Sequence, residues 1–361
     1  MSRNLTLHIV ASVPYSNLNR DDSGTPKRVV QGGALRALHS SQAIKRGIRT
    51  MYEEASMVTS VRSGQLVAEI VDRAKTLGSG LDEKALTKAA TDIVGTLTKK
   101  ESAAGDGASD NAVTESDRSI WMSSEEIEAA AAAAVAGQTD GDFIKDGVTG
   151  SLAIAAFGRM FANAPAKNTE AAIAVSPAVT THAATIDTDY FSTVDDLRER
   201  KNDLGATFLG VFQFTNGVFY RSVTIDKDQL KKSWTGWDRD DAAANLKELV
   251  NAIIYGQPRG KVNATAPYIQ PALILAEEQR YRVAYDFETP VDADGTTGGY
   301  LTPTIDTLAA QFAQARKFDA DNFGPLEVLS GTSEHLDEAF DTLTPVSKND
   351  LIDAVVNWTR A

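Results

Sequence analysis

The first apolar stretch of the chain, LTLHIVASV, alternates in polarity from one residue to the next. Leu5, Leu7 and Ile9 alternate with polar residues, which is the pattern of a strand with one buried face. Residues 14–33 follow and are rich in glycine and proline, so we expect a loop without regular structure there.

The next segment, HSSQAIKRGIRTMYEEAS, repeats apolar residues at helical spacing. Ile44, Ile48 and Met51 stand at positions i, i+4 and i+7 and form one apolar stripe. Ser40 or Ser41 can cap the N-terminus through its hydroxyl oxygen. The pattern predicts an amphipathic helix directly after the loop.

From about residue 58 the pattern becomes helical. Residues 63–77 and 83–99 read as two helices, and residues 99–119 are polar and of low complexity. Ser123 and Glu126 then have the spacing of a capping box before an alanine-rich helix. Residues 58–150 are therefore predicted to be a helical insertion within a mixed domain.

The remainder of the chain alternates between strand and helix. Residues 217–227 and 271–287 read as strands, residues 241–256 and 304–318 as amphipathic helices, and residues 324–331 as a final strand. This order fits a small ferredoxin-like sheet with helices on one face. Its first strand and helix would precede the insertion and the rest would follow it.

Composition excludes several classes of function. The 361 residues include no cysteine, so disulfides, thiol nucleophiles and thiolate-bound zinc are excluded. The four histidines show no metal-binding spacing, so we expect neither a metal nor a cofactor. No apolar run approaches the ~20 residues that cross a bilayer, and the N-terminus does not resemble a signal peptide. We expect a cytoplasmic protein with no membrane partner.

Charge is distributed unevenly along the chain. The net charge is −13, yet residues 1–57 carry an excess of four positive charges. Residues 20–49 contain seven Lys and Arg residues but only two acidic residues. An acidic protein with one basic segment suits a local polyanion site better than binding over its whole surface.

The predicted helix places polar side chains on one face. Gln42, Lys45 and Arg49 lie at i, i+3 and i+7, where they can bind phosphate oxygens. Ser40 stands at the start of the helix, where free N–H groups also favour an anion. Arg20 and Lys27, in the preceding loop, could close over the same anion. A solvated helix face is equally consistent with the composition.

The same segment has residues that raise two other functions, nucleotide binding and phosphodiester cleavage. The stretch QGGALRA has neither glycine spacing of a nucleotide-binding loop, so separated cations suit a repeated phosphate backbone better. Asp21 and Asp22 could hold Mg²⁺ for phosphodiester cleavage. Adjacent carboxylates point in different directions, however, and no general base is near in sequence. A loop-capping pair, or a partner for Arg20, is favoured.

A second region contains apolar residues in polar surroundings. Met160 follows an arginine in FGRMFANAP, and Tyr190, Phe191 and Val194 lie in DYFSTVDD. Apolar tips on polar loops can stack on bases or wedge between them. Taken by themselves, these residues would more simply cap a local core.

Together these segments resemble the repeated backbone subunit of type I-E CRISPR Cascade complexes. The resemblance begins with LNRDD, Lys27, Gly32-Gly33, Arg36, SSQ, Lys45-Arg46 and Arg49. It continues with GRM at residues 158–160, TTH…VDDL at residues 180–197 and LG…GVFYR at residues 209–221. The motifs are ordered and lie on both sides of the helical insertion; the insertion and the C-terminal third match only in outline.

The resemblance implies a hand-shaped α+β protein with an RRM-like (ferredoxin-like) palm. The palm would comprise residues 1–57 and 214–361, helical fingers residues 58–180, and a thumb residues 181–213. Copies would stack head to tail along a CRISPR RNA guide, with other Cascade subunits, and leave guide segments free to pair with target DNA. The protein would hold the guide without cutting it.

The resemblance also implies roles for individual residues. Guide phosphates would be held by the six polar residues of the basic segment: Arg20, Lys27, Ser40, Gln42, Lys45 and Arg49. Met160 would pack against a base, and Tyr190, Phe191 and Val194 would form the tip of the thumb, which displaces a base at regular intervals. Tyr190 is a mild variant of the aromatic residue found there in the family.

Two alternatives stay open at this point. Related subunits of type III complexes cut target RNA with a loop aspartate, so Asp21 or Asp22 could make the chain an endonuclease. A stand-alone RNA-binding regulator would carry a similar basic segment and bind short RNA as a monomer. We rank the backbone subunit first, the regulator second and the nuclease third.

Overall fold

The computed structural model describes residues 4–78, 80–98, 119–193 and 208–361. The chain divides into two compact units. The first unit contains residues 1–49, 175–224 and 249–361, and the second contains residues 50–174 and 225–248. Each unit is built from segments that are distant in sequence, so neither corresponds to one continuous stretch of chain.

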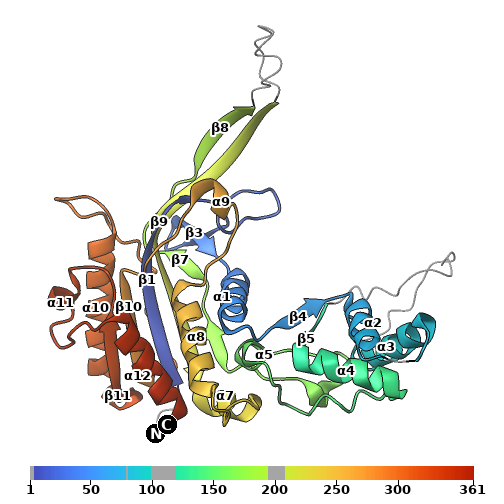
Figure 1. The fold of residues 1–361 in the computed structure, drawn as a ribbon. Coiled ribbons are helices and arrows are strands. Elements are labelled where there is room, and N and C mark those ends of the chain that lie inside the picture. The colour runs from blue at the N-terminus through green and yellow to red at the C-terminus, as the bar shows by residue number, and fades with distance from the viewer. Residues whose placement is uncertain (1–3, 79, 99–118, 194–207) are drawn as a thin grey trace. The chain divides into compact units, whose positions relative to one another are not determined.

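Among the described residues, nine strands share one sheet, shown in Figure 1. The strand order is β11-β10-β1-β9-β7-β3-β2, and β6 and β8 also pair with β9. β1 pairs antiparallel with β10, and β10 pairs antiparallel with β11. The strands are β1 (Asn4–Ser16), β2 (Arg28–Gln31), β3 (Ala34–His39), β6 (Ile173–Val175), β7 (Ala178–Thr180), β8 (Asp187–Thr193), β9 (Phe208–Asp226), β10 (Leu273–Gln279) and β11 (Phe323–Ser330).

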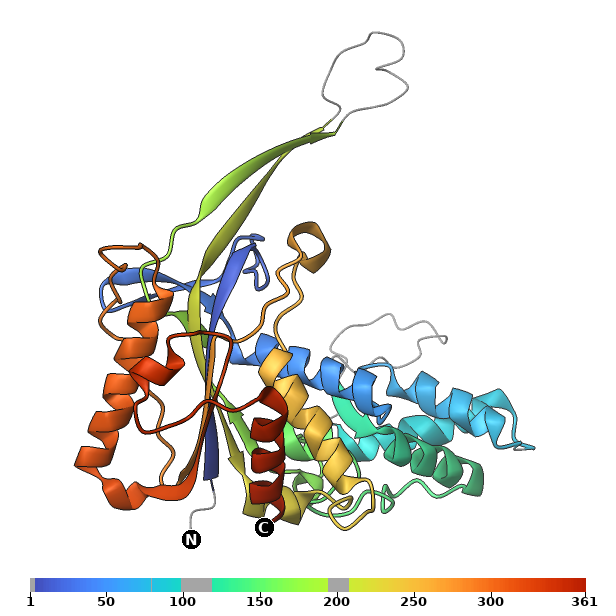
Figure 2. The ribbon, with the colours of Figure 1, turned by 60° about the vertical axis from the view of Figure 1, so that its left-hand side comes forward.

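Helices cover both faces of this sheet, so the expectation of helices on one face is wrong. Val10, Leu273 and Leu275 pack with Ile305 and Leu308 of α10 (Leu301–Phe318) in one core cluster. On the other side of β1 lie the C-terminal half of α8 (Ala242–Tyr255) and α12 (Lys348–Arg360), as Figure 2 shows.

Because helices lie on both sides of the sheet, β1 is buried on both of its faces. Its residues from Asn4 to Ala11 are all buried, including Thr6 and His8, which the alternation of polarity would place in solvent. A strand between two helical layers loses its wet face, and polar residues there must find partners inside. The prediction of a half-buried strand is wrong for this reason.

Residues 14–33 contain more regular structure than the glycine and proline content indicates. β1 continues to Ser16, and β2 pairs with β3 in a hairpin in which Gln31 lies opposite Ala34. Gly32 and Gly33 connect the two strands with φ values of 58° and 72°. A two-residue turn with two positive φ values matches the twist of a hairpin, so these glycines join strands.

The second unit contains a helical cluster. Its elements are α2 (Leu66–Thr76), α3 (Glu83–Leu97), α4 (Ser124–Ala136), β4 (Ser60–Ser63) and β5 (Ile120–Ser123). Apolar residues of α2, α3 and α4, such as Ile70, Ile93 and Ala130, form one buried core with β5. The predicted capping box of α4 is confirmed, since the hydroxyl of Ser123 accepts from Glu126 N–H while the Glu126 carboxylate accepts from Ser123 N–H. β4 and β5 pair antiparallel beside these helices.

The other helices are α1 (Ser41–Ser56), α5 (Leu152–Phe157), α7 (Lys227–Ser233), α9 (Val262–Thr265) and α11 (Leu336–Ala339), with 3₁₀ turns at Pro165–Lys167 and Ala320–Asn322. Within the described residues no helix is both long and apolar enough to cross a bilayer.

Candidate nucleic-acid interface

Asn19 joins the basic loop to the start of α1. Its backbone carbonyl accepts from the N–H of Lys27 at 2.9 Å, and its side-chain oxygen accepts from the N–H of Ser40 at 2.7 Å. Arg20 forms an isolated bridge with Pro26 across the same loop. Three predicted residues, Arg20, Lys27 and Ser40, are thereby gathered at the N-terminus of one helix.

The helix α1 presents the polar face that the sequence predicts. Ser40 is the N-cap, because its hydroxyl accepts from the N–H of Ala43 at 3.4 Å. Ile44 and Ile48 are fully buried on one side, whereas Gln42 is exposed and Lys45 and Arg49 are half-buried. The buried residues fix the rotation of the helix about its axis and so decide which way the polar face points.

Two glycines allow α1 to approach the end of α8 closely. A Cβ atom on Gly47 would lie 2.2 Å from the carbonyl oxygen of Gln257, and one on Gly256 would lie 2.8 Å from Cα of Ile48. Both distances are far shorter than a van der Waals contact, so any larger residue would push the two segments apart. The position of α1 therefore depends on this crossing.

Arg221 holds the C-terminal end of α8, which is the other segment in this crossing. Its guanidinium group donates to the carbonyl oxygens of Ile253, Ile254 and Gly256 at 2.7 to 2.8 Å. These carbonyls are the ones that a helix leaves unpaired at its C-terminus, where a cation is also favoured by the helix dipole. Burial lowers the pKa of Arg221 to about 10, and it stays charged at neutral pH.

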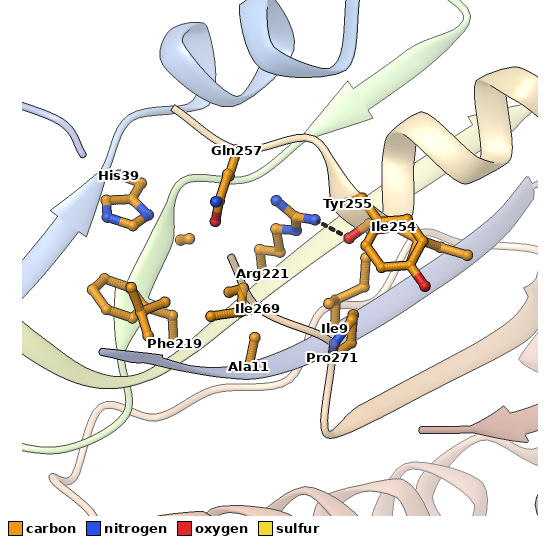
Figure 3. A pocket seen from close by; sticks show the side chains of 12 residues that line it. Ile9, Ala11, His39, Phe219, Arg221, Ile254, Tyr255, Gln257, Ile269 and Pro271 are labelled. Carbon is orange, nitrogen blue, oxygen red and sulfur yellow. Dashed lines mark hydrogen bonds between the residues drawn. The ribbon is translucent and has the colours of Figure 1, made fainter. Parts of the chain in front are cut away.

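Next to Arg221 lies a small cavity, shown in Figure 3. It has a volume of about 30 Å³ and is lined by His39, Gln257 and apolar residues such as Ile9 and Phe219. Burial, and then the charge of Arg221, lowers the pKa of His39 to about 3, so the imidazole is neutral. A space of this size holds about one water molecule, and no nucleotide fits into it.

The cations of the basic loop and of α1 differ in their partners. In the described parts of the chain, no carboxylate forms an ion pair with Arg20, Lys27 or Lys45. Arg36 behaves differently, although it belongs to the same basic segment. It is fully buried and donates to the carbonyl oxygens of Thr180, Phe287 and Glu288. Its guanidinium group therefore joins segments of the interior and does not face solvent.

Asp21 caps its own loop, as the favoured interpretation predicted. Its carboxylate accepts from the N–H and the hydroxyl of both Ser23 and Thr25, at 2.6 to 3.0 Å. These hydrogen bonds, led by the Thr25 hydroxyl, lower the pKa of Asp21 to about 2. Across the described residues no three acidic or histidine side chains form a group that could hold a metal.

The strands β8 and β9 form a two-stranded ribbon that carries the predicted aromatic pair. Tyr190 lies opposite Val211 and is 69% exposed, while Phe191 lies opposite Gly210. The two aromatic residues point to opposite faces, as adjacent strand residues do. Phe191 stacks on Phe212 with ring centroids 4.3 Å apart. Val194, the third predicted tip residue, falls outside the described residues.

Met160 belongs to the second unit. Its side chain is 76% exposed, although its neighbours Arg159 and Phe161 are both buried. Arg159 forms an ion pair with Glu126, and its guanidinium group lies 4.8 Å from the ring of Phe161. The residues of the basic segment belong to the first unit.

Lys261 is a basic residue near this segment that the sequence interpretation did not single out. Its ammonium nitrogen lies 2.7 Å from the ring centroid of Phe212, and the charge of Arg20 contributes to lowering its pKa, after burial. Lys261 is more than 200 residues away from Arg20 in sequence, so only the fold brings them together. The sequence signal available was the pair of cations around Gly260 in PRGK.

Comparison with solved structures finds chains of the same fold. One, from a structure titled "CRISPR RNA-guided surveillance complex, pre-nicking", is 25% identical, with a TM-score of 0.82 over 99% of this chain and 100% of that chain. Another, from a "CRISPR RNA-guided surveillance complex", is 22% identical, with a TM-score of 0.73 over 98% and 99% of the two chains. A search of the curated proteins found no match.

A family model also matches nearly the whole chain. The Cas_CT1975 model, described as "CT1975-like protein", matches residues 5–358, which include both units and every motif of the basic segment. This family is non-catalytic, which agrees with a carboxylate at Asp21 that serves as a loop cap. The chain belongs to the CT1975-like family, the backbone subunits of type I-E CRISPR Cascade surveillance complexes.

Proposed function

We propose that the chain has an RRM-like palm, which holds the CRISPR RNA guide by its phosphates. In this proposal residues 1–57 and 214–361 supply the palm, residues 58–180 the fingers and residues 181–213 the thumb. The guide-binding residues of the palm are Arg20, Lys27, Ser40, Gln42, Lys45 and Arg49.

The observation that carries this proposal is the contrast between two kinds of cation in one segment. The guanidinium group of Arg36 donates to backbone carbonyls inside the fold. Arg20, Lys27 and Lys45, in contrast, have no carboxylate partner in the described residues. In a protein of net charge −13, cations that no carboxylate of the chain neutralises stay available to an anion from outside. A row of separated cations fits the repeated phosphates of a nucleic acid backbone.

The remaining site residues have roles toward bases. Met160 packs against a base of the guide, and Tyr190, Phe191 and Val194 act at the thumb that covers the guide held by the next copy. Exposed apolar and aromatic side chains suit this role, because stacking on a base is indifferent to its identity. Copies associate head to tail along the guide and leave segments of it free to pair with target DNA.

The salt dependence of RNA binding tests the phosphate contacts. For single-stranded RNA, each neutralised phosphate contributes about 0.7 to the slope of log K against log salt concentration. The double variant Lys27→Ala/Lys45→Ala should therefore lower that slope by about 1.4. Fluorescence anisotropy with a guide-length RNA at several salt concentrations measures it.

The matched control is Lys317→Ala. Lys317 is exposed near the end of α10 and lies outside the proposed interface. This variant should bind with the slope of the unmodified protein. A double variant that keeps the full slope would contradict the proposal, since the two lysines would then be solvated surface residues.

A further inference from the structure

The loop after α8 is pressed against the segment that carries Arg20. The N–H of Gly260 donates to the carbonyl oxygen of Leu18 at 2.9 Å. A Cβ atom at residue 260 would lie only 2.5 Å from that oxygen, so the approach requires glycine. Lys261 follows Gly260 in the sequence, and Arg20 follows Leu18 by two residues. The contact between Gly260 and Leu18 therefore brings the segments that carry the two cations together.

The backbone of Lys261 is in an unusual conformation. Its φ is 48°, in the left-handed region that side chains other than glycine, asparagine and aspartate seldom adopt. Strain of this kind persists where the surrounding structure enforces it, and it concentrates at binding sites. The contact of Gly260 with Leu18 provides that enforcement on one side.

The ammonium group of Lys261 is held in place by aromatic rings. It lies 2.7 Å from the ring centroid of Phe212 and 5.9 Å from that of Phe214. Both rings belong to β9, close to the point where the β8–β9 ribbon leaves the sheet. Phe214 also packs against Tyr15 at 4.5 Å, which ties this part of the ribbon to β1.

The fold thus brings two like charges together. Burial and the neighbouring Arg20 both lower the pKa of Lys261. In the described parts of the chain neither cation has a carboxylate partner. Two cations that act on each other and have no carboxylate partner there are available to one anion from outside.

We propose that Lys261 and Arg20 together bind a phosphate of the guide RNA at the base of the β8–β9 ribbon. Lys261 is then a further guide-binding residue, contributed by a loop far from the basic segment in sequence. The contact with Phe212 limits the movement of the ammonium group. This inference rests on the proposed function, since it extends the same interface.

The competing explanation is that Lys261 only braces the ribbon through its contact with Phe212. A brace and a phosphate ligand differ in one measurable respect. A brace contributes to stability without an ion-release term, whereas a phosphate ligand contributes about 0.7 to the salt slope of RNA binding.

The test compares salt slopes for Lys261→Ala, Lys261→Asn and Lys261→Arg with a guide-length single-stranded RNA. Asparagine tolerates the left-handed backbone and removes the charge, so it covers the case in which the alanine variant does not fold. We expect the neutral variants to lose about 0.7 of the slope, and the arginine variant to keep it.

Two controls separate this inference from the proposed function. Lys317→Ala should leave the slope unchanged, and Lys27→Ala/Lys45→Ala should lower it. If the double variant loses slope while Lys261→Asn keeps all of it, the inference is overturned and the proposed function stands. If neither variant changes the slope, both are overturned.

Discussion

At the scale of single residues, a buried carboxylate beside β1, that of Glu277, is surrounded by hydrogen-bond donors. The Nε2 atom of His8 lies 2.8 Å from the Glu277 carboxylate, and its Nδ1 atom lies 2.8 Å from the Tyr220 hydroxyl. Tyr285 and Arg316 also donate to the Glu277 carboxylate. Every partner comes from a different element, so the network specifies how strands and α10 assemble.

Replacing Glu277 with glutamine should be strongly destabilising. Burial alone would raise the pKa of Glu277, but hydrogen bonds from His8 and Arg316 outweigh it and lower the pKa to about 2. Removing a buried partner costs about 3 to 5 kcal/mol, because the groups left behind lose their counter-charge. Urea unfolding at neutral pH measures this, with Glu327→Gln, at a more exposed carboxylate, expected to cost less.

The same variant has a defined pH dependence. Because the folded pKa is lowered, the ionised carboxylate stabilises the fold above the ordinary pKa of 4.5, and this contribution is lost as pH falls toward 2. The difference in unfolding free energy between the protein and Glu277→Gln should therefore shrink below about pH 4.5. A difference that stays constant down to pH 3 would argue against ionisation of Glu277 in the fold.

At the scale of elements, local rules predicted some features well. The spacing of Ile44 and Ile48 predicted α1, and the Ser123–Glu126 pair predicted the capping box of α4. Both signals lie within one or two turns of chain. The β2–β3 hairpin was missed because Gly32 and Gly33, taken as breakers of structure, are what its turn requires.

Other features depended on contacts between distant segments. The burial of His8 follows from α10, which the chain reaches only after residue 300. Arg36 looks in sequence like its neighbouring cations, yet it is drawn inside by carbonyls at residues 180 and 287. Lys261 comes close to Arg20 through a loop that no local pattern connects to it. Sequence patterns therefore placed the basic segment but could not separate its exposed and buried members.

The crossing of α1 and α8 gives a prediction at this scale. In an exposed helix interior, Gly→Ala normally stabilises by about 1 kcal/mol. Gly47→Ala should do the opposite and cost roughly 1 to 3 kcal/mol, because the new Cβ would meet the carbonyl of Gln257. Thermal unfolding checks the sign. A raised melting temperature would show that α1 is free to shift, and that its polar face is not fixed by this contact.

At the scale of the whole molecule, the net charge and the basic segment have opposite signs and different effects. The net charge of −13 makes copies of the chain repel one another, while the basic segment attracts a polyanion. A guide RNA that neutralises the basic segment can then bring copies into sequence along its length. A head-to-tail interface that does not close on itself extends into a filament, so the length of the RNA should set the number of copies.

Native mass spectrometry with RNAs of increasing length tests this central claim most directly. We predict that the number of bound copies rises in steps with RNA length, and that the variant Lys45→Ala/Arg49→Ala loses binding together with much of its salt dependence. One bound copy at every length, or a variant that assembles like the unmodified protein, would contradict a guide-binding backbone.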